Sequence, residues 1–300
     1  MGWQYSVTIE LDTDQRRAAE LPPEARQIVM AGPGSGKTHT VTALIRNLMD
    51  EHDVLPEEIV VISFSRAAVH AARSRAADGV QEGSLVEFRT LDSWASLIVS
   101  EYGDEDVPFT GYDARIKHAT RLIAAGADVL EDVAHLVVDE MQDVVGLRAV
   151  LLLEILRAAT ARGIGFSLLG DPMQALYDFQ LTEKAQLDTE QLLYRVRGLG
   201  DVSEVTLSGS YRARHDSSRR ASRAHRELME APKDEQYGIV VSACSDVLQL
   251  GALEEALEVL RAWPGSAAFL TDTNVRAAAV RDYLRSYGVA AELRLSLIHI

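Results

Sequence analysis

The chain has 300 residues, of which 47% are hydrophobic and 25% are charged, a balance typical of globular chains that bury a substantial core. The formal net charge of −15 argues against coating nucleic acid by bulk electrostatics but leaves room for a local DNA groove. Cys244 is the one cysteine and no apolar run reaches the length of a membrane span, so we expect a cytoplasmic protein without an intramolecular disulfide or a membrane partner.

Short β-branched runs alternate with longer amphipathic or Ala-rich segments along the chain. Strands are predicted near residues 27–31, 59–64, 84–88, 135–139, 165–169, 204–208, 238–242 and 267–271. Helices are predicted at about 38–50, 66–77, 91–101, 146–161, 212–229, 246–262 and 274–287. Such alternation is typical of parallel sheets covered by helices, so the predicted fold class is α/β.

The first predicted strand and helix enclose the segment AGPGSGKTHT, residues 31–40. It fits the pattern G-x-x-x-x-G-K-[ST] through Gly32, Gly36, Lys37 and Thr38. Glycines let successive N–H groups point into one concavity at a helix N-terminus, which suits a triphosphate. Lys37 would reach the β- and γ-phosphates and the Thr38 hydroxyl would ligate Mg²⁺. The alternative is a Gly-rich turn that binds nothing, which the flanking strand and helix disfavour. The segment's residues assigned to ATP are Gly32, Pro33, Gly34, Ser35, Gly36, Lys37, Thr38 and His39.

Two carboxylates, Asp139 and Glu140, end the predicted strand in the stretch HLVVDEMQD. Ligands of parallel sheets bind outside the carboxyl ends of the strands, where the loop around Lys37 would also lie. Asp139 would hold Mg²⁺, and Glu140 would orient or deprotonate the attacking water. The alternative is a polar loop that follows a core strand, and the phosphate loop upstream makes this alternative the weaker one.

A third strand ends in polar residues in the stretch SLLGDPMQALYDF, which contains Asp171 and Gln174. Gln174 is a neutral group suited to sensing a γ-phosphate. Tyr177 and Phe179 would be base-stacking platforms if the loop faced a nucleic-acid groove. Aromatic residues at this spacing more often belong to a core, so the stretch alone does not separate the two interpretations.

AGPGSGKT, VVDEMQD, GDPMQALYDF and LSGSYRA occur in one order, and together they resemble the motifs of superfamily 1 helicases of the UvrD/Rep/PcrA type. The resemblance runs from about residue 11 to about residue 289. It implies a P-loop NTPase with two RecA-like domains, ATP between them, and single-stranded or partly duplex DNA as partner. It also implies ATP-driven movement with 3′ to 5′ polarity and a role in DNA repair, replication or recombination.

The same resemblance implies roles for residues outside the phosphate loop. Gln15 would read the adenine edge, Tyr211 would stack on the base, and Arg212 would be an arginine finger that stabilises the transferring phosphoryl group. Together with Asp139, Glu140 and Gln174, Arg212 completes the catalytic set. The implied contacts to single-stranded DNA are Phe64, Tyr177 and Phe179.

The chain departs from the family at several positions. Arg66 and Ala67 stand where the family usually carries Asn-Lys, and Asp92 stands where it has His, which puts DNA contacts from these two loops in doubt. Only residues 95–136 separate RTLDSW from VVDEMQD, too few for the usual helical insertion. We therefore expect a short-form member with less surface for engaging a duplex.

The resemblance assigns residues 1–205 to a RecA-like ATP-binding domain and residues 206–294 to the start of a second one. The family's later motifs, which supply a second arginine finger, do not follow, so we expect a C-terminal truncation. Residues 295–300 read as a translation of CTG TCT CTT ATA CAC ATC, which resembles a sequencing-library adapter, and are expected to be an artefact. A chain without the second arginine finger should hydrolyse ATP slowly and unwind nothing.

Other P-loop classes fit the sequence less well. LSGS at 207–210 faintly resembles a transporter-ATPase signature, but it follows the Asp139–Glu140 pair instead of preceding it. A GTPase would carry Asn-Lys-x-Asp, whereas Asn47 and Asn274, the only asparagines, lie in no such context. A DNA-dependent ATPase or DNA-binding module that does not unwind, within a nuclease complex or as a regulator, stays open.

Overall fold

The computed structural model describes residues 10–63, 86–103, 111–175, 187–213, 216–245 and 251–293. The chain divides into two compact units, Met1–Ala243 and Cys244–Ile300. The boundary predicted after residue 205 falls within a strand of the first unit. The assignment of residues 206–294 to a second RecA-like domain therefore stays a prediction.

A six-stranded sheet forms the centre of the first unit, in the order β3-β2-β4-β5-β1-β6, and every neighbouring pair in it is parallel. Its strands are β1 (Arg26–Ala31), β2 (Ile59–Ser63), β3 (Glu87–Arg89), β4 (His135–Asp139), β5 (Gly165–Gly170) and β6 (Val202–Leu207). The central strands are almost continuously buried, as expected when helices cover both faces. The α/β prediction and six of the predicted strands are confirmed.

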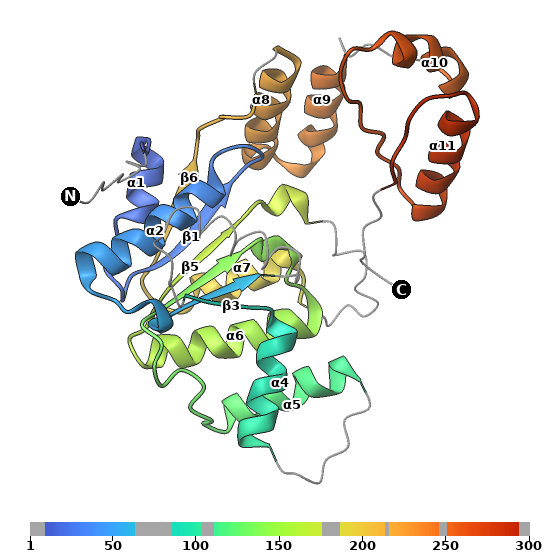
Figure 1. Ribbon diagram of the computed structural model, residues 1–300. Helices are drawn as coiled ribbons and strands as arrows, with labels where there is room; N and C mark the ends of the chain where they lie inside the picture. The colour runs from blue at the N-terminus through green and yellow to red at the C-terminus, as the bar shows by residue number, and fades with distance from the viewer. Residues whose placement is uncertain are drawn as a thin grey trace, which may run out of the picture. The chain divides into compact units, whose positions relative to one another are not determined.

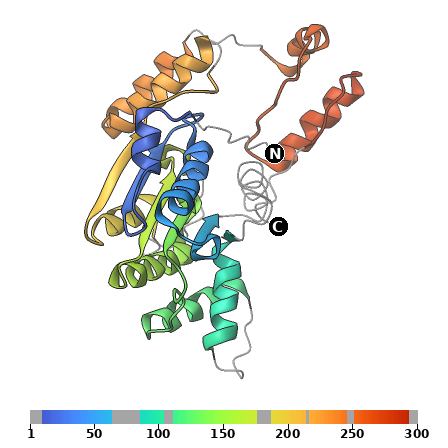
Figure 2. The ribbon, with the colours of Figure 1, turned by 60° about the vertical axis from the view of Figure 1, so that its left-hand side comes forward.

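Helices cover the two faces of this sheet, as Figures 1 and 2 show for α2 and α6. On one face, Val29 and Val61 pack with Leu44 and with α1 (Thr13–Ala19) and α2 (Lys37–His52). On the other face, Ile62 and Phe166 pack against four helices. These are α4 (Leu91–Tyr102), α5 (Tyr112–Ala124), α6 (Gly146–Ala161) and α7 (Thr189–Arg197). Neighbouring residues of a strand thus enter different cores, because side chains alternate across a sheet.

Within the described ranges, short 3₁₀ helices follow or precede strands: η1 (Pro56–Glu58), η2 (Met141–Asp143) and η3 (Pro172–Gln174). After β6 the chain forms α8 (Asp216–Glu230) and α9 (Lys233–Cys244). The predicted strand at 238–242 is wrong because it lies inside α9. Lys233, Asp234 and Glu235 follow Pro232 and begin the helix; this helix-start signal outweighs the β propensity of the GIVVS run.

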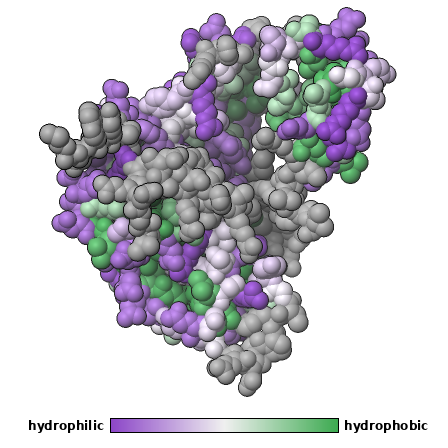
Figure 3. Space-filling model, viewed as in Figure 1, coloured by the Kyte–Doolittle hydropathy of each residue, from purple (hydrophilic) through white to green (hydrophobic). Residues whose placement is uncertain are grey.

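The second unit contains α10 (Leu253–Ala262) and α11 (Asn274–Ser286). The predicted strand at 267–271 is wrong, since these residues form no regular element, and the described part of this unit offers no strand with which they could pair. Hydrophobic side chains gather over α10 and α11 in Figure 3. Trp263, Val275 and Tyr287 of this unit are exposed. The predicted helix at 66–77 lies outside the described residues.

Candidate nucleotide-binding site

The loop between β1 and α2 has the backbone of a phosphate-binding nest. Gly34 and Gly36 have φ values of +75° and +87°, which glycine adopts without steric cost. Gly36 is the N-cap of α2 and offers no side-chain cap to the first-turn N–H groups. The Ser35 hydroxyl is buried without a hydrogen-bond partner among the described residues. A helix N-terminus without a side-chain cap, together with an orphaned buried hydroxyl, fits an anionic ligand.

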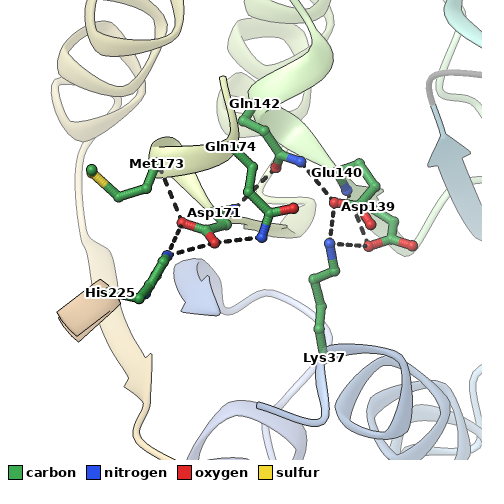
Figure 4. A network of polar contacts seen from close by, with 8 residues as sticks. All are labelled: Lys37, Asp139, Glu140, Gln142, Asp171, Met173, Gln174 and His225. Atoms are coloured by element: carbon green, nitrogen blue, oxygen red, sulfur yellow. Dashed lines mark hydrogen bonds and ion pairs between the residues drawn. The ribbon is translucent and has the colours of Figure 1, made fainter. Parts of the chain in front are cut away.

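Lys37, the first residue of α2, extends to the carboxyl end of β4. Its Nζ lies 3.5 Å from Asp139 Oδ1 and forms a second ion pair with Glu140, as Figure 4 shows. The three side chains come from segments about a hundred residues apart in the sequence, and the parallel order of β1, β5 and β4 brings them to one edge. The sequence-predicted phosphate lysine and carboxylate pair therefore converge.

The three carboxylates around Lys37 have different proton affinities. Burial raises the pKa of Asp139 above its ordinary value, although the Lys37 ammonium opposes the rise. Burial also raises the pKa of Glu140, but Lys37 and a hydrogen bond from Gln142 together outweigh it, and the pKa lies below the ordinary value. Burial and the charge of Glu140 raise the pKa of Asp143 to about 6. Glu140 is thus the carboxylate held ionised.

Glu140 occupies a strained backbone position. Its φ is +56°, in the left-handed region that residues other than Gly, Asn and Asp seldom adopt. The strain redirects the chain from β4 into η2 and places the Glu140 side chain beside Lys37. Such strain is concentrated at functional sites in proteins.

Gln142 joins the carboxyl ends of β4 and β5. Its side chain is buried, its Nε2 donates to Glu140 Oε2 at 2.8 Å, and its Oε1 accepts from the Asp171 N–H at 3.0 Å. The amide thus fixes Glu140 relative to the loop that carries Gln174. It shares Glu140 Oε2 with Lys37, which pairs with the same oxygen.

Asp171 is a buried carboxylate that accepts hydrogen bonds from several donors. It accepts from the Met173 N–H at 3.1 Å, from Gln174 Nε2 at 2.6 Å and from His225 Nε2 at 2.7 Å. Gln174 itself is exposed, and the bond to Asp171 orients its amide. His225 reaches this cluster from α8 and was not among the sequence-predicted residues.

The predicted base-binding residues lie beside the phosphate loop. Gln15 is buried, and its Nε2 donates to the Ser35 carbonyl at 3.3 Å. The Tyr211 N–H donates to the Gly34 carbonyl at 2.8 Å, and its hydroxyl donates to Asp12. That hydrogen bond, with burial and nearby acidic charge, raises the pKa of Tyr211 to about 12.

Arg212 follows Tyr211 and lies over the phosphate loop. A Cβ placed on Gly34 would lie 3.0 Å from Arg212 Cβ. The stem of the arginine is therefore close to the nest, while the residue is exposed. Pro33 and His39 are also exposed, and their contact with ATP stays a prediction.

The donors around Lys37 fit Mg²⁺ better than a transition metal. No group of three or more His, Cys, Asp or Glu side chains that could hold a metal occurs among the residues whose placement is described. Mg²⁺ takes one or two protein oxygens, with phosphate oxygens and water completing its shell. Thr38 and Asp139 are the predicted pair and are of the right chemical type.

The three predicted DNA contacts, Phe64, Tyr177 and Phe179, lie outside the described residues, as do Arg66 and Ala67. Asp92 lies in the first turn of α4 and forms a bidentate ion pair with Arg148 of α6. Arg148 Nη2 donates to Asp92 Oδ1 at 2.7 Å, and Arg148 Nε donates to Asp92 Oδ2 at 2.9 Å. It thus joins two helices of the unit. Over the described ranges, no helix is long and apolar enough to cross a membrane.

Asp12, Asp143 and His225 are the site residues that sequence reasoning missed. Asp12 caps α1 and forms a capping box with Gln15, so the D-x-x-Q pattern was a usable signal. Asp143 lies within the stretch DEMQD but was given no role. His225 carried no local signal, since its partner Asp171 lies 54 residues away.

Three comparisons with known proteins agree with this geometry. Residues 11–125 match the UvrD/REP helicase N-terminal domain. The ATP-dependent DNA helicase srs2 of Schizosaccharomyces pombe is 32% identical over 95 residues, 31% of this chain and 11% of that protein. The ATP-dependent DNA helicase PcrA of Staphylococcus aureus is 37% identical over 65 residues, 22% of this chain and 9% of that protein. The matched segments thus span about a tenth of these relatives.

The fold has a counterpart among solved structures. The Pif1 helicase from Candida albicans superposes with a TM-score of 0.51 over 94% of this chain and 56% of that one, at 16% identity. The parallel sheet is therefore a RecA-like helicase fold. Within this fold, residues 11–125 are the part that is similar to the UvrD/REP helicase N-terminal domain.

Proposed function

We propose that this chain carries the ATP-hydrolysing centre of a UvrD-type DNA helicase. The observation that carries the proposal is the convergence of Lys37 with Asp139 and Glu140 beside a glycine nest at the carboxyl edge of the sheet. The relatives' names, ATP-dependent DNA helicases, support the choice of ATP and DNA over other ligands of P-loop proteins.

The N–H groups of the nest would bind the β- and γ-phosphates. Lys37 would turn toward the phosphates and release Asp139 and Glu140 for their own roles. Thr38 and Asp139 would hold Mg²⁺, which neutralises charge on the β- and γ-phosphates when bound. Glu140, with its lowered pKa, would accept the proton of the attacking water.

Gln174 and Arg212 would act on the γ-phosphate. Gln174 donates one amide hydrogen to Asp171, so its carbonyl oxygen and second hydrogen remain for water and phosphate. Arg212, whose stem lies over Gly34, would place its planar charge against the phosphoryl oxygens. Opening and closing of the ATP cleft would then drive stepping along single-stranded DNA.

Phe64, Tyr177 and Phe179 would stack on the bases, which is sequence-tolerant and suits a motor. We propose that the protein moves in the 3′ to 5′ direction along single-stranded DNA. We also propose that it acts in DNA repair, replication or recombination in the cytoplasm.

The test is ATP turnover by the protein in the full length that its gene encodes, with and without single-stranded DNA. Strand separation is measured in parallel on duplexes with a 3′ or a 5′ tail, and Lys37→Ala serves as the inactive control. DNA-stimulated turnover with unwinding of the 3′-tailed duplex is the expected result. Stimulated turnover without unwinding would favour a DNA-dependent ATPase module, and absence of turnover would overturn the proposal.

A further inference from the structure

His225 of α8 lies between two loops of the nucleotide site. One edge of its ring faces the phosphate loop, since a Cβ placed on Gly32 would lie 2.9 Å from its Nδ1 and Cε1. Its Nε2 lies 2.7 and 2.9 Å from the two oxygens of Asp171. Because a carboxylate accepts, Nε2 carries the hydrogen in this contact. The imidazole therefore connects the loop after β1 with the loop after β5.

This contact is shielded from water. The His225 side chain is 13% exposed and the Asp171 side chain 1%, so the hydrogen bond is stronger than a similar one at the surface. The same carboxylate binds the amide of Gln174 at 2.6 Å, as Figure 4 shows. Gln174 is exposed and would otherwise sample several rotamers. The orientation of Asp171 thus decides where the Gln174 amide points.

We propose that His225 is a positioning residue that sets Gln174 for γ-phosphate sensing and links α8 to the phosphate loop. The inference rests on the proposed function, because it concerns ATP hydrolysis at this site. His225 acts through Asp171. Movement of α8 would displace His225, turn the Asp171 carboxylate and change the direction of the Gln174 amide, so the rate of hydrolysis would report the position of α8.

The arrangement also accounts for Gly32 independently of phosphate binding. Any side chain at this position would collide with the ring, because 2.9 Å is shorter than Cβ contacts in real structures. The glycine thus allows the imidazole to approach the loop. A substitution at Gly32 is therefore a second way to disturb the contact between His225 and Asp171.

His225→Leu and His225→Gln test the proposal in the full-length protein. Leu fills similar space but cannot donate, whereas the Gln amide can place an N–H near the position of Nε2. We expect His225→Leu to lower kcat for ATP about tenfold while the ATP Kd changes by less than about threefold. His225→Gln should keep kcat within about threefold of the wild-type value, because the amide replaces the lost donor. His52→Leu, at an exposed position near the end of α2, is the matched control and should behave as wild type.

A double-mutant cycle with Gln174→Ala separates positioning from a general structural effect. If His225 acts through Gln174, His225→Leu should lower kcat less than about twofold further in the Gln174→Ala background. Gly32→Ala should lower kcat in the wild type, and it should lower kcat less than about twofold further in the His225→Ala background, where there is no ring to displace.

Several outcomes would overturn the inference. An unchanged kcat in His225→Leu, failure of Gln to rescue, or full additivity with Gln174→Ala would each show that the contact only supports the fold. ATP turnover by the wild type is measured first, so its absence would identify a failure of the proposed function itself, before any substitution is compared.

Discussion

The Lys37 ammonium lies 3.5 Å from Asp139 Oδ1. Asp139 and Glu140 provide Lys37 with the anionic partners that phosphates would provide during nucleotide binding. Two carboxylates side by side raise each other's proton affinity, and the lysine offsets this effect at both. Phosphate binding would therefore exchange one set of anionic partners of Lys37 for another, and the proposed function gives the positive and the negative groups of the site distinct roles.

Lys37→Ala and Glu140→Gln should separate these roles. Lys37→Ala removes the charge that faces the phosphates and should weaken ATP binding at least about tenfold. Glu140→Gln keeps the shape of the side chain but cannot accept a proton, so binding should stay within about threefold while hydrolysis slows by about a hundredfold or more. Titration with a fluorescent ATP analogue and single-turnover hydrolysis measure the two quantities.

An equal loss of ATP affinity in the two variants would contradict the assignment of Glu140 as the base. Lys117→Ala, on α5, is a suitable control because it removes a lysine far along the chain from the loop; both quantities should stay at wild-type values.

Tyr211→Ala and Tyr211→Phe should distinguish stacking from hydrogen bonding. Tyr211 is 55% exposed beside the phosphate loop, while its hydroxyl donates to Asp12. Loss of the ring should lower ATP affinity about tenfold, given about 1–3 kcal/mol for a base stacked on an aromatic ring. Tyr211→Phe keeps the ring and should bind within about threefold of wild type. Isothermal titration calorimetry with ATP measures both.

Tyr194→Ala, at an exposed position on α7, controls for the removal of a surface tyrosine and should leave affinity unchanged. Equal weakening in Tyr211→Phe and Tyr211→Ala would indicate that the bond to Asp12, and not the ring, carries the contribution.

The central strands were predictable because their apolar runs are bounded by polar or glycine residues and are buried on both faces. β4 and β5 are examples. Their apolar segments HLVVD and GFSLLG fit few places in a globular fold other than a buried strand. The run at 238–242 has similar composition but follows a helix-start signal, and local composition alone does not decide between the two. The helices α1, α5, α7 and α9 were not predicted; α1 and α7 are short, and α9 has no distinct apolar face.

The candidate site also contains residues that the sequence predicts and residues that it does not. Lys37, Asp139 and Glu140 carry local patterns that fix their place at the ends of strands, and the rule for parallel sheets brings strand ends together. The contact between His225 and Asp171 depends on the path of the chain from β6 into α8. No pattern within either segment reports that path, so only a three-dimensional structure reveals the pair.

Phe64→Ala and Phe179→Ala should weaken binding of single-stranded DNA and leave ATP binding unaltered. Both residues lie outside the described part of the chain, and their role follows from the family resemblance. Each lost stack should cost about 1–3 kcal/mol of DNA affinity. Fluorescence anisotropy with a labelled oligonucleotide measures it in the full-length protein. If each variant instead melts earlier with unchanged DNA affinity, the rings belong to a core.

His135 should make the stability of the first unit depend on pH. The imidazole is fully buried; Nδ1 donates to the Pro23 carbonyl at 2.7 Å, and Nε2 accepts from the Ser167 hydroxyl at 3.0 Å. Burial lowers its pKa to about 4 from an ordinary value of 6.5, although the hydrogen bond to Pro23 opposes the shift. The folded protein therefore keeps His135 neutral at pH values where the unfolded chain protonates it.

The sign follows from this difference. Below pH 6.5 the unfolded chain binds a proton that the native state does not, so the free energy of unfolding falls as the pH falls from about 6.5 toward 4. His135→Gln cannot titrate and lacks this contribution. The stability advantage of the wild type over His135→Gln should therefore shrink by about 1.4 kcal/mol between pH 7.5 and pH 5.5. Urea unfolding at both pH values, which lie above the sequence pI of about 5.0, measures the change, and His52→Gln, at an exposed position, should show none. A constant difference between wild type and His135→Gln across this range would show that His135 is not held neutral by burial.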